Sequence, residues 1–335
     1  MSSNSLPPHG LNQKMIPLPP MNDRFQSAIL ESTKASAFYE KEIIQELWSG
    51  YGQIIRISLK DAPINHVVVK HVQLAQQSNH ARGWNTNQGH QRKIKSYQVE
   101  TKWYSDYSQS STTRLPKCLA VVNQNDEVLM ILEDLNEAGF SLRKHSVNWK
   151  DISTCLEWLA KFHASFLNHN PEGLWSVGTY WHLDTRPEEL AALDDQILKE
   201  AAPLIDQKLN NCKFKTFVHG DAKLANFCFS NKGNVAGVDF QYVGGGCGMK
   251  DVAYFIGSCL AESECESLEG DILDTYFMHL QSALGVKNQA LESEWRSLYR
   301  VAWADFHRFL KGWSPGHWKI NSYSDRITKE VIKKL

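Results

Sequence analysis

The stretch that decides the fold runs from residue 217 to 241 and reads FVHGDAKLANFCFSNKGNVAGVDFQ. An apolar entry leads to His219-Gly220-Asp221, and Asn226 follows five residues after that aspartate. A polar turn at 231–234 then leads into a second apolar run, which ends at Asp239. The pattern predicts a strand, a loop that carries a carboxylate and an amide, a hairpin, and a second carboxylate.

These side chains suit the transfer of a phosphoryl group. An aspartate near an acceptor hydroxyl can orient it and take its proton, while an asparagine and a second aspartate can hold Mg²⁺ against nucleotide phosphates. The alternative is a surface hairpin in which Asp221, Asn226 and Asp239 only cap turns. Because all three groups occur in this order, with Asp239 eighteen residues after Asp221, we favour a phosphoryl-transfer site over a surface hairpin.

The spacing H-x-D-x-x-x-x-N followed by D-F-x resembles the aminoglycoside phosphotransferase and choline kinase superfamily, whose fold is protein-kinase-like. Gly220 stands where protein kinases carry arginine, and in this respect the loop resembles that of small-molecule kinases. The triplet Asp239-Phe240-Gln241 resembles the ecdysteroid-kinase-like branch. The resemblance covers nearly the whole chain after residue 22. It implies an α+β, two-lobed fold with a small antiparallel β-sheet in the N-lobe and a mainly α-helical C-lobe.

The resemblance also implies roles for the loop residues. Asp221 is expected to position and deprotonate the acceptor hydroxyl, and Asn226 and Asp239 are expected to bind Mg²⁺. His219 is expected to buttress this catalytic loop through hydrogen bonds rather than to act as the base. Lys223 either reaches the transferred phosphoryl group or is a solvated loop charge, and the sequence leaves both interpretations open.

The chain before this stretch offers groups for binding ATP. Residues 41–60 are predicted to form two strands joined by a turn that contains Gly50 and Gly52. In the related kinases such a turn folds over the phosphates, and a hairpin without that role is the alternative. The next predicted strand, 66–72, carries Lys70 in a valine-rich run. The resemblance implies that Lys70 contacts the α- and β-phosphates, the alternative being an edge-strand lysine.

Glu100 is the expected partner of Lys70. A helix is predicted over 94–107, and its segment ETKWY resembles the ExxFY segment of the N-lobe helix in this superfamily. The polar residues 78–93 before it are predicted to form a mobile loop that helps to close over the nucleotide or the substrate.

The segment ILEDL resembles the hinge of the family. The resemblance implies that adenine is bound by the carbonyl of Glu133 and the N–H of Leu135. We therefore predict a flexible arm at 1–22, a nucleotide-binding N-lobe at 23–135 and a C-lobe at 136–335 that carries the catalytic loop and the acceptor-binding helices.

The C-lobe is predicted to be helical over 151–167 and 188–209. The aromatic segment 175–187 between them is expected to be either acceptor-binding surface or a packed loop. Asp251 is expected to cap a helix, and by resemblance to brace the catalytic loop.

Trp303 and Asp305 lie in a long apolar-striped helix near the C-terminus. Aromatic and acidic groups from this region hold a quaternary ammonium in choline kinases, which makes these two residues candidates for the acceptor site.

The composition excludes several classes of protein. With 335 residues and a formal net charge of −1, nothing favours nucleic acid or an anionic membrane as a partner. No apolar run reaches the length of a membrane span, and the N-terminus lacks the pattern of a secretion signal. Seven cysteines without a CxxC pair indicate a cytoplasmic protein, and the histidines lack the spacing of a zinc site.

The sequence thus predicts an enzyme, dependent on ATP and Mg²⁺, that phosphorylates a hydroxyl of a small molecule. A catalytically inactive nucleotide-binding or scaffold protein with the kinase fold is the alternative. A protein kinase is disfavoured by Gly220, by Gln241 and by the short segment that follows.

Overall fold

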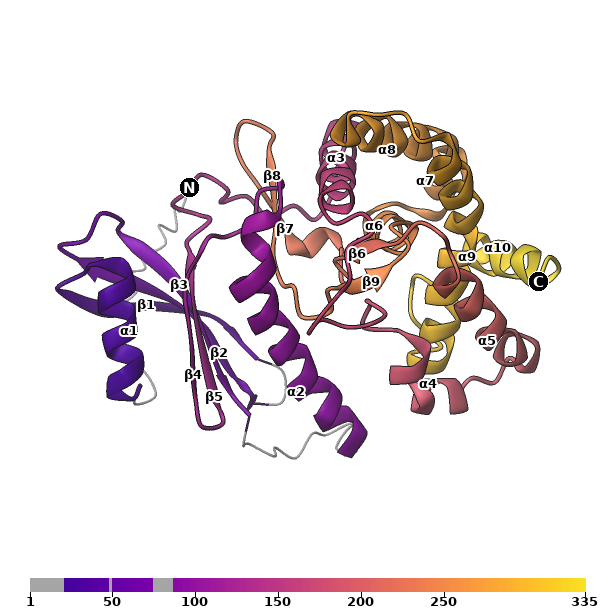
Figure 1. Ribbon diagram of the computed structural model, residues 1–335. Coiled ribbons are helices and arrows are strands. Elements are labelled where there is room, and N and C mark those ends of the chain that lie inside the picture. Colours follow the sequence, from indigo (N-terminus) through magenta and orange to yellow (C-terminus); the bar gives the residue numbers. More distant parts are fainter. Residues whose placement is uncertain (1–20, 48–49, 75–86) are drawn as a thin grey trace, which may run out of the picture.

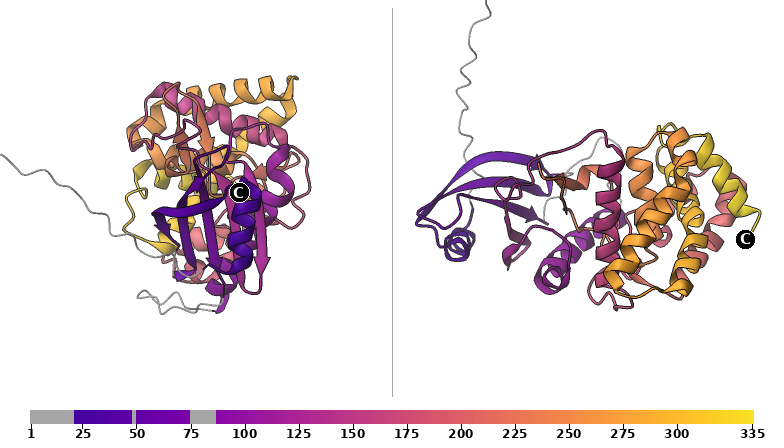
Figure 2. Two further views of the ribbon diagram at one scale, coloured as in Figure 1. Left: turned by 90° about the vertical axis from the view of Figure 1, so that its left-hand side faces the viewer. Right: turned by 90° about the horizontal axis from the view of Figure 1, so that it is seen from above.

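The structure is a computed structural model and describes residues 21–47, 50–74 and 87–335. The predicted arm at 1–22, except its last two residues, and most of the predicted loop at 78–93 lie outside these residues. A five-stranded sheet lies at one end of the described chain and a cluster of helices at the other (Figures 1 and 2). Within the described part, no helix is both long enough and apolar enough to cross a bilayer.

The sheet is antiparallel throughout and has the strand order β1-β2-β3-β5-β4. Helix α1 lies on one side of it and α2 runs between the sheet and the other helices (Figure 1). The bounds of these elements are α1 Asp23–Thr33, β1 Ala37–Glu46, β2 Gly52–Lys60, β3 His66–Gln73, α2 Asn87–Lys102, β4 Cys118–Gln124 and β5 Glu127–Glu133.

Alternation of side chains along β3 decides which residues face the helical half. Val67 and Val69 are fully buried and share a cluster with Phe25 and Ile29 of α1. The period of two therefore turns Lys70 to the opposite face, where its cross-strand neighbours are Ile54 of β2 and Met130 of β5.

The second half of the chain is helical. Helix α3 packs against α8, and α9 packs against α5, α6 and α10. The helices are α3 Trp149–Ser165, α4 Pro187–Ala191, α5 Gln196–Asn210, α6 Met249–Cys259, α7 Glu262–Ser267, α8 Glu269–Leu284, α9 Gln289–Trp313 and α10 Ser322–Ile332.

Two short strand pairs hold the loops that carry the motif. Strand β6 (Thr216–Val218) pairs with β9 (Gly244–Gly246), and β7 (Phe227–Phe229) pairs with β8 (Val235–Gly237). The glycines of β9 permit close packing, because a Cβ on Gly244 would collide with the backbone carbonyl oxygen of Trp175. The predicted strand, loop, hairpin and second carboxylate are therefore present in order.

Three predicted boundaries were wrong. Helix α2 begins at Asn87 rather than at 94, so 87–93 is helical and not loop. The predicted helix 188–209 is interrupted between α4 and α5, where the Asp195 side chain caps the new helix. Asp251 does not cap α6, which begins two residues earlier at Met249.

The packing around β9 generates a stability prediction. Gly244→Ala should lower the free energy of unfolding by roughly 1–3 kcal/mol, because the new methyl group displaces the Trp175 backbone. Gly270→Ala is the matched control, since it lies in α8 with open space around the new Cβ and should leave stability equal or slightly higher. Denaturant unfolding followed by circular dichroism measures both, and equal midpoints for the two variants would contradict the packing argument.

Candidate active site

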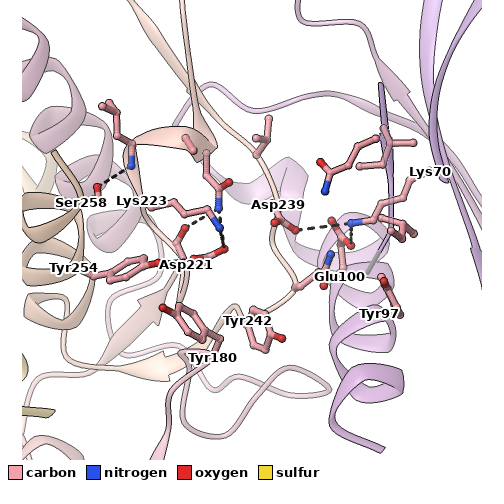
Figure 3. A pocket seen from close by; sticks show the side chains of 18 of the residues that line it. Lys70, Tyr97, Glu100, Tyr180, Asp221, Lys223, Asp239, Tyr242, Tyr254 and Ser258 are labelled. Atoms are coloured by element: carbon pink, nitrogen blue, oxygen red, sulfur yellow. Dashed lines mark hydrogen bonds and ion pairs between the residues drawn. The ribbon is translucent and has the colours of Figure 1, made fainter. Parts of the chain in front are cut away.

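A cavity of about 1110 Å³ lies between the sheet and the helical half of the chain. Its walls come from β1, β2, β3, α2, β5 and the segment after it, Tyr180 and Arg186, the segments 221–228 and 238–242, α6, the C-terminal end of α9 and residues 317–319. The volume exceeds the usual range for a single small ligand, which suits two reactants side by side. Figure 3 shows the carboxylates of Asp221 and Asp239 on opposite sides of the same space.

Lys70, Glu100 and Asp239 meet on the sheet side of the cavity (Figure 3). The Lys70 Nζ lies 2.6 Å from Glu100 Oε2 and 3.8 Å from Asp239 Oδ1. Burial raises the pKa of Glu100, although Lys70 acts in the opposite direction. For Asp239 burial alone would raise the pKa, but nearby lysines, Lys70 foremost, hold it below its ordinary value. The predicted lysine–glutamate pair is therefore present and faces the second carboxylate.

Asp221 lies across the cavity at the centre of a hydrogen-bond network. Its Oδ2 accepts from Lys223 Nζ at 2.8 Å and from Asn226 Nδ2 at 3.1 Å, and its Oδ1 accepts from the Tyr254 hydroxyl at 3.1 Å. Burial raises the pKa of Asp221 despite the charge of Lys223 beside it. Lys223 is thus ion-paired with the predicted base and is not only a solvated loop charge. Burial alone would lower the pKa of Lys223, but the negative charge of Asp221 and its hydrogen bond outweigh burial, so the pKa is raised.

His219 and Asp251 hold the loop from behind. The buried carboxylate of Asp251 accepts the backbone N–H groups of His219, at 2.6 Å, and of Gly220, at 2.9 Å. The His219 ring bridges the two halves of the motif, since its Nε2 lies 3.0 Å from the Val238 carbonyl and its Nδ1 accepts the Asp221 N–H at 3.3 Å. This geometry agrees with a buttressing His219 and with a bracing role for Asp251.

The donor set fits a hard divalent cation. Asp239 Oδ1 is a buried carboxylate oxygen without a hydrogen-bond partner, and its backbone is left-handed with φ +71°. Asn226 donates its Nδ2 twice to Asp221, to the backbone oxygen at 2.7 Å and to Oδ2. The oxygen of that amide is therefore the end that could ligate a metal, as Mg²⁺ requires.

Lys93 was missed by the sequence analysis, which placed it in a loop. It projects from α2 with its Nζ 4.7 Å from the centroid of the Tyr97 ring and 3.0 Å from Gln241 Oε1. Burial lowers the pKa of Lys93 to about 8, with Asp239 acting against this. Ser96 also donates to Gln241 Oε1, at 3.3 Å. The glutamine after Asp239-Phe240 thus positions a second lysine, a link that sequence spacing could not reveal.

The other predicted nucleotide contacts remain predictions. Glu133 and Leu135 line the cavity, as the hinge interpretation requires. Between β1 and β2, Tyr51 lines the cavity but Gly50 and Gly52 do not. Both glycines have left-handed backbones, with φ +74° and +124°. A Cβ on Gly52 would collide with the His71 backbone, so the hairpin alone accounts for that glycine.

Trp303 and Asp305 do not line the cavity, so they are wrong as candidates for an ammonium site. Asp305 is completely buried, accepts from Trp181 Nε1 at 3.0 Å and pairs with Arg308 at 2.8 Å. The Trp303 ring packs edge-on against Tyr323. Both face the interior of the helical half because the apolar stripe of α9 is wider than the sequence suggested.

Solved structures share this fold. A Ralstonia eutropha protein assigned to the aminoglycoside phosphotransferases is 12% identical, with coverage of 93% of this chain and 95% of that one and a TM-score of 0.56. An amicoumacin kinase in complex with AMP-PNP, Ca²⁺ and its antibiotic is 12% identical, with 92% and 93% coverage and a TM-score of 0.54. A spectinomycin phosphotransferase in complex with ADP and spectinomycin is 10% identical, with 93% and 95% coverage and a TM-score of 0.50.

At these identities the likeness shows the fold, and it confirms the predicted two-lobed, kinase-like α+β architecture. A comparison with curated proteins finds no match. The model of the ecdysteroid kinase-like family matches residues 55–172 and 176–288, more than half of the chain. The predicted resemblance is thereby confirmed, and the chain belongs to the ecdysteroid kinase-like family.

Proposed function

We propose that the protein transfers the γ-phosphoryl group of ATP, with Mg²⁺, to a hydroxyl group of a small molecule. The observation that carries the proposal is the convergence of Asp221, Asn226 and Asp239 on one cavity that also receives the Lys70–Glu100 pair. Family membership and the shared fold support a phosphotransferase. The unpaired state of all seven cysteines is compatible with the cytoplasmic location that we propose.

Asp221 is the proposed general base. A raised pKa brings a carboxylate closer to the working pH, where proton transfer from a hydroxyl is most effective. The hydrogen bonds from Asn226 and Tyr254 fix the orientation of its two oxygens before the acceptor arrives. The acceptor hydroxyl therefore belongs on the Asp221 side of the cavity, and the nucleotide on the Lys70 side.

Asn226 and Asp239 are the residues that would hold Mg²⁺, through the amide oxygen and the carboxylate. A bound Mg²⁺ neutralises charge on the phosphates during transfer. Lys70, kept in place by Glu100, is the proposed ligand of the α- and β-phosphates. Lys93 adds a second cation next to Asp239, and we assign it to the γ-phosphate.

Substitution of the two aspartates tests the reaction. Asp221→Asn should lower turnover roughly 10²- to 10⁴-fold over a panel of hydroxyl compounds, because the base is lost while its shape is kept. Asp239→Ala should abolish turnover and the thermal stabilisation by Mg-ATP. The measurements are ADP release and melting temperature, with the exposed Asp271→Asn as the control that retains both.

Full activity in both variants would contradict the mechanism. Stabilisation of the wild-type protein by Mg-ATP, without phosphorylation of any hydroxyl compound, would favour the inactive scaffold instead.

The titration of Lys93 gives a pH prediction. Its pKa of about 8 means that Lys93 is charged below that pH and loses its charge as the pH rises. ATP affinity should therefore fall between pH 7 and pH 9, and Lys93→Met should bind ATP about tenfold more weakly at pH 7 with less of this pH dependence. Titration calorimetry measures the ATP affinity and its pH dependence.

Lys95→Met is the matched control, because Lys95 lies in the same helix but does not line the cavity. Identical pH profiles of ATP affinity for the two variants would exclude a phosphate contact by Lys93.

A further inference from the structure

The acceptor side of the cavity has an aromatic wall. We define this wall as Tyr180, Tyr254, Phe306 and Phe309, all of which line the cavity. The ring centroids of Tyr254 and Phe306 lie 4.8 Å apart, and those of Tyr180 and Phe309 lie 5.5 Å apart. Tyr254 also donates to Asp221, so the wall begins at the proposed base, as Figure 3 shows for Tyr180 and Tyr254. Three of these rings are buried and pack edge to face, but all four line the cavity, so this side offers an aromatic contact surface to a ring-bearing molecule.

Lys319 reaches this wall from the segment between α9 and α10. Its Nζ lies 4.9 Å from the centroid of the Tyr254 ring and 5.5 Å from that of Phe306. Among the described residues no carboxylate lies within ion-pairing distance of its Nζ. Burial lowers the pKa of Lys319 to about 8, the charge of Asp221 acts in the opposite direction, and the charge of Lys223 lowers it further. At neutral pH Lys319 is therefore a partly buried positive charge whose Nζ lies over the faces of two aromatic rings.

Two arginines lie near this side of the cavity, and one of them already has a carboxylate partner. Arg186 donates Nε to the Tyr180 carbonyl at 2.6 Å, pairs with Glu189 at 3.0 Å and stacks 5.3 Å from the centroid of the Phe309 ring. Arg92 donates to the Thr185 carbonyl at 2.6 Å, and in the described chain it has no carboxylate at ion-pairing distance. Burial and the charge of Arg186 both lower the pKa of Arg92, while Glu189 and Glu188 act in the opposite direction.

Carboxylates that could attract a cation are already occupied. Every described acidic residue that lines the cavity lies within ion-pairing distance of a basic side chain. The pairs are Glu100 with Lys70, Glu133 with Arg114, Asp134 with Arg56, Asp221 with Lys223, and Asp239 with Lys70. Asp305 is sealed behind the wall by Arg308 and Trp181. A cationic acceptor would therefore meet like charge on the acceptor side, at a cost that grows with burial.

We propose that the acceptor is an anionic ring alcohol, a flat hydroxylated compound that carries a carboxylate or a comparable anionic group. Its ring lies on the aromatic wall, its hydroxyl faces Asp221, and its anionic group pairs with Lys319. This assignment rests on the proposed function, because it uses Asp221 to mark the reacting hydroxyl. It also separates this cavity from one that accepts a choline-like or polyamino compound, since both of those are cationic.

Three probes on one scaffold test the charge preference. Each is a hydroxymethylbiphenyl that bears a para carboxylate, a para carboxamide or a para aminomethyl group. Titration calorimetry at pH 7 with the full-length protein should show the carboxylate binding about tenfold or more tightly than the ammonium compound, with the amide between them. Lys319→Gln should reduce this ratio to about twofold, and Lys319→Arg should retain it. The exposed Lys333→Gln is the matched control and should retain it too.

The proposal is overturned by tighter or equal binding of the ammonium probe, by an unchanged ratio in a folded Lys319→Gln variant, or by no binding of the carboxylate at millimolar concentration. Arg92→Gln provides an independent variant, which should weaken the carboxylate probe and spare the amide. Because binding is measured without turnover, these outcomes concern the acceptor class. Absence of phosphoryl transfer in the aspartate experiment concerns the proposed reaction instead.

Discussion

One buried carboxylate organises the centre of the molecule. Asp251 has no exposed surface, and it accepts hydrogen bonds from two consecutive backbone N–H groups of the loop and from His163 Nε2 at 3.1 Å. An unpaired charge at this depth would be very costly, so all three donors are held where they are. The carboxylate thus ties together α3, α6 and the backbone immediately before Asp221. The second of these N–H groups belongs to Gly220, whose backbone is left-handed with φ +79°. Glycine adopts this conformation without steric cost.

The same hydrogen bonds fix the position of Asp221 relative to Asp239. His219 is fixed by Asp251 through its backbone, and its ring contacts the carbonyl of Val238, the residue before Asp239. A shift of the loop would therefore move both ends of the motif together. On the far side of the cavity, Asp239 meets Lys70, whose direction is set by the alternation of β3. The sheet and the helical half are thus aligned through a small number of buried charges.

Most of this arrangement was predictable, for a physical reason. A strand alternates sides, so an isolated lysine between Val69 and His71 had to face away from the core shared with α1. The loop could be predicted because its donors and carboxylates occur at short, fixed spacing. The Lys70–Glu100 pair required a tertiary contact, and only the resemblance to related kinases supplied it.

The features that the sequence analysis missed are charged side chains at positions without a recognisable apolar pattern. The first turns of α2 carry His90, Arg92 and Lys93 toward the cavity, which removes the apolar periodicity by which a buried helix is recognised. Lys319 lies in a short segment between helices, and no local pattern indicates that it reaches Tyr254. The wrong assignment of Asp305 has the opposite cause, since a charge in an apolar stripe can be neutralised by a neighbour three residues away, here Arg308.

The position of Lys319 between α9 and α10 has an evolutionary consequence. The proposed phosphate-binding groups are encoded in the sheet, in α2 and in residues 219–241, whereas Lys319 and half of the aromatic wall are encoded after residue 300. A duplicated gene can therefore acquire a different acceptor compound through changes in the codons after residue 300, while the codons for the proposed phosphate-binding groups stay unchanged. Diversification within such a lineage should be recorded in the codons for α9 and for the segment that follows it.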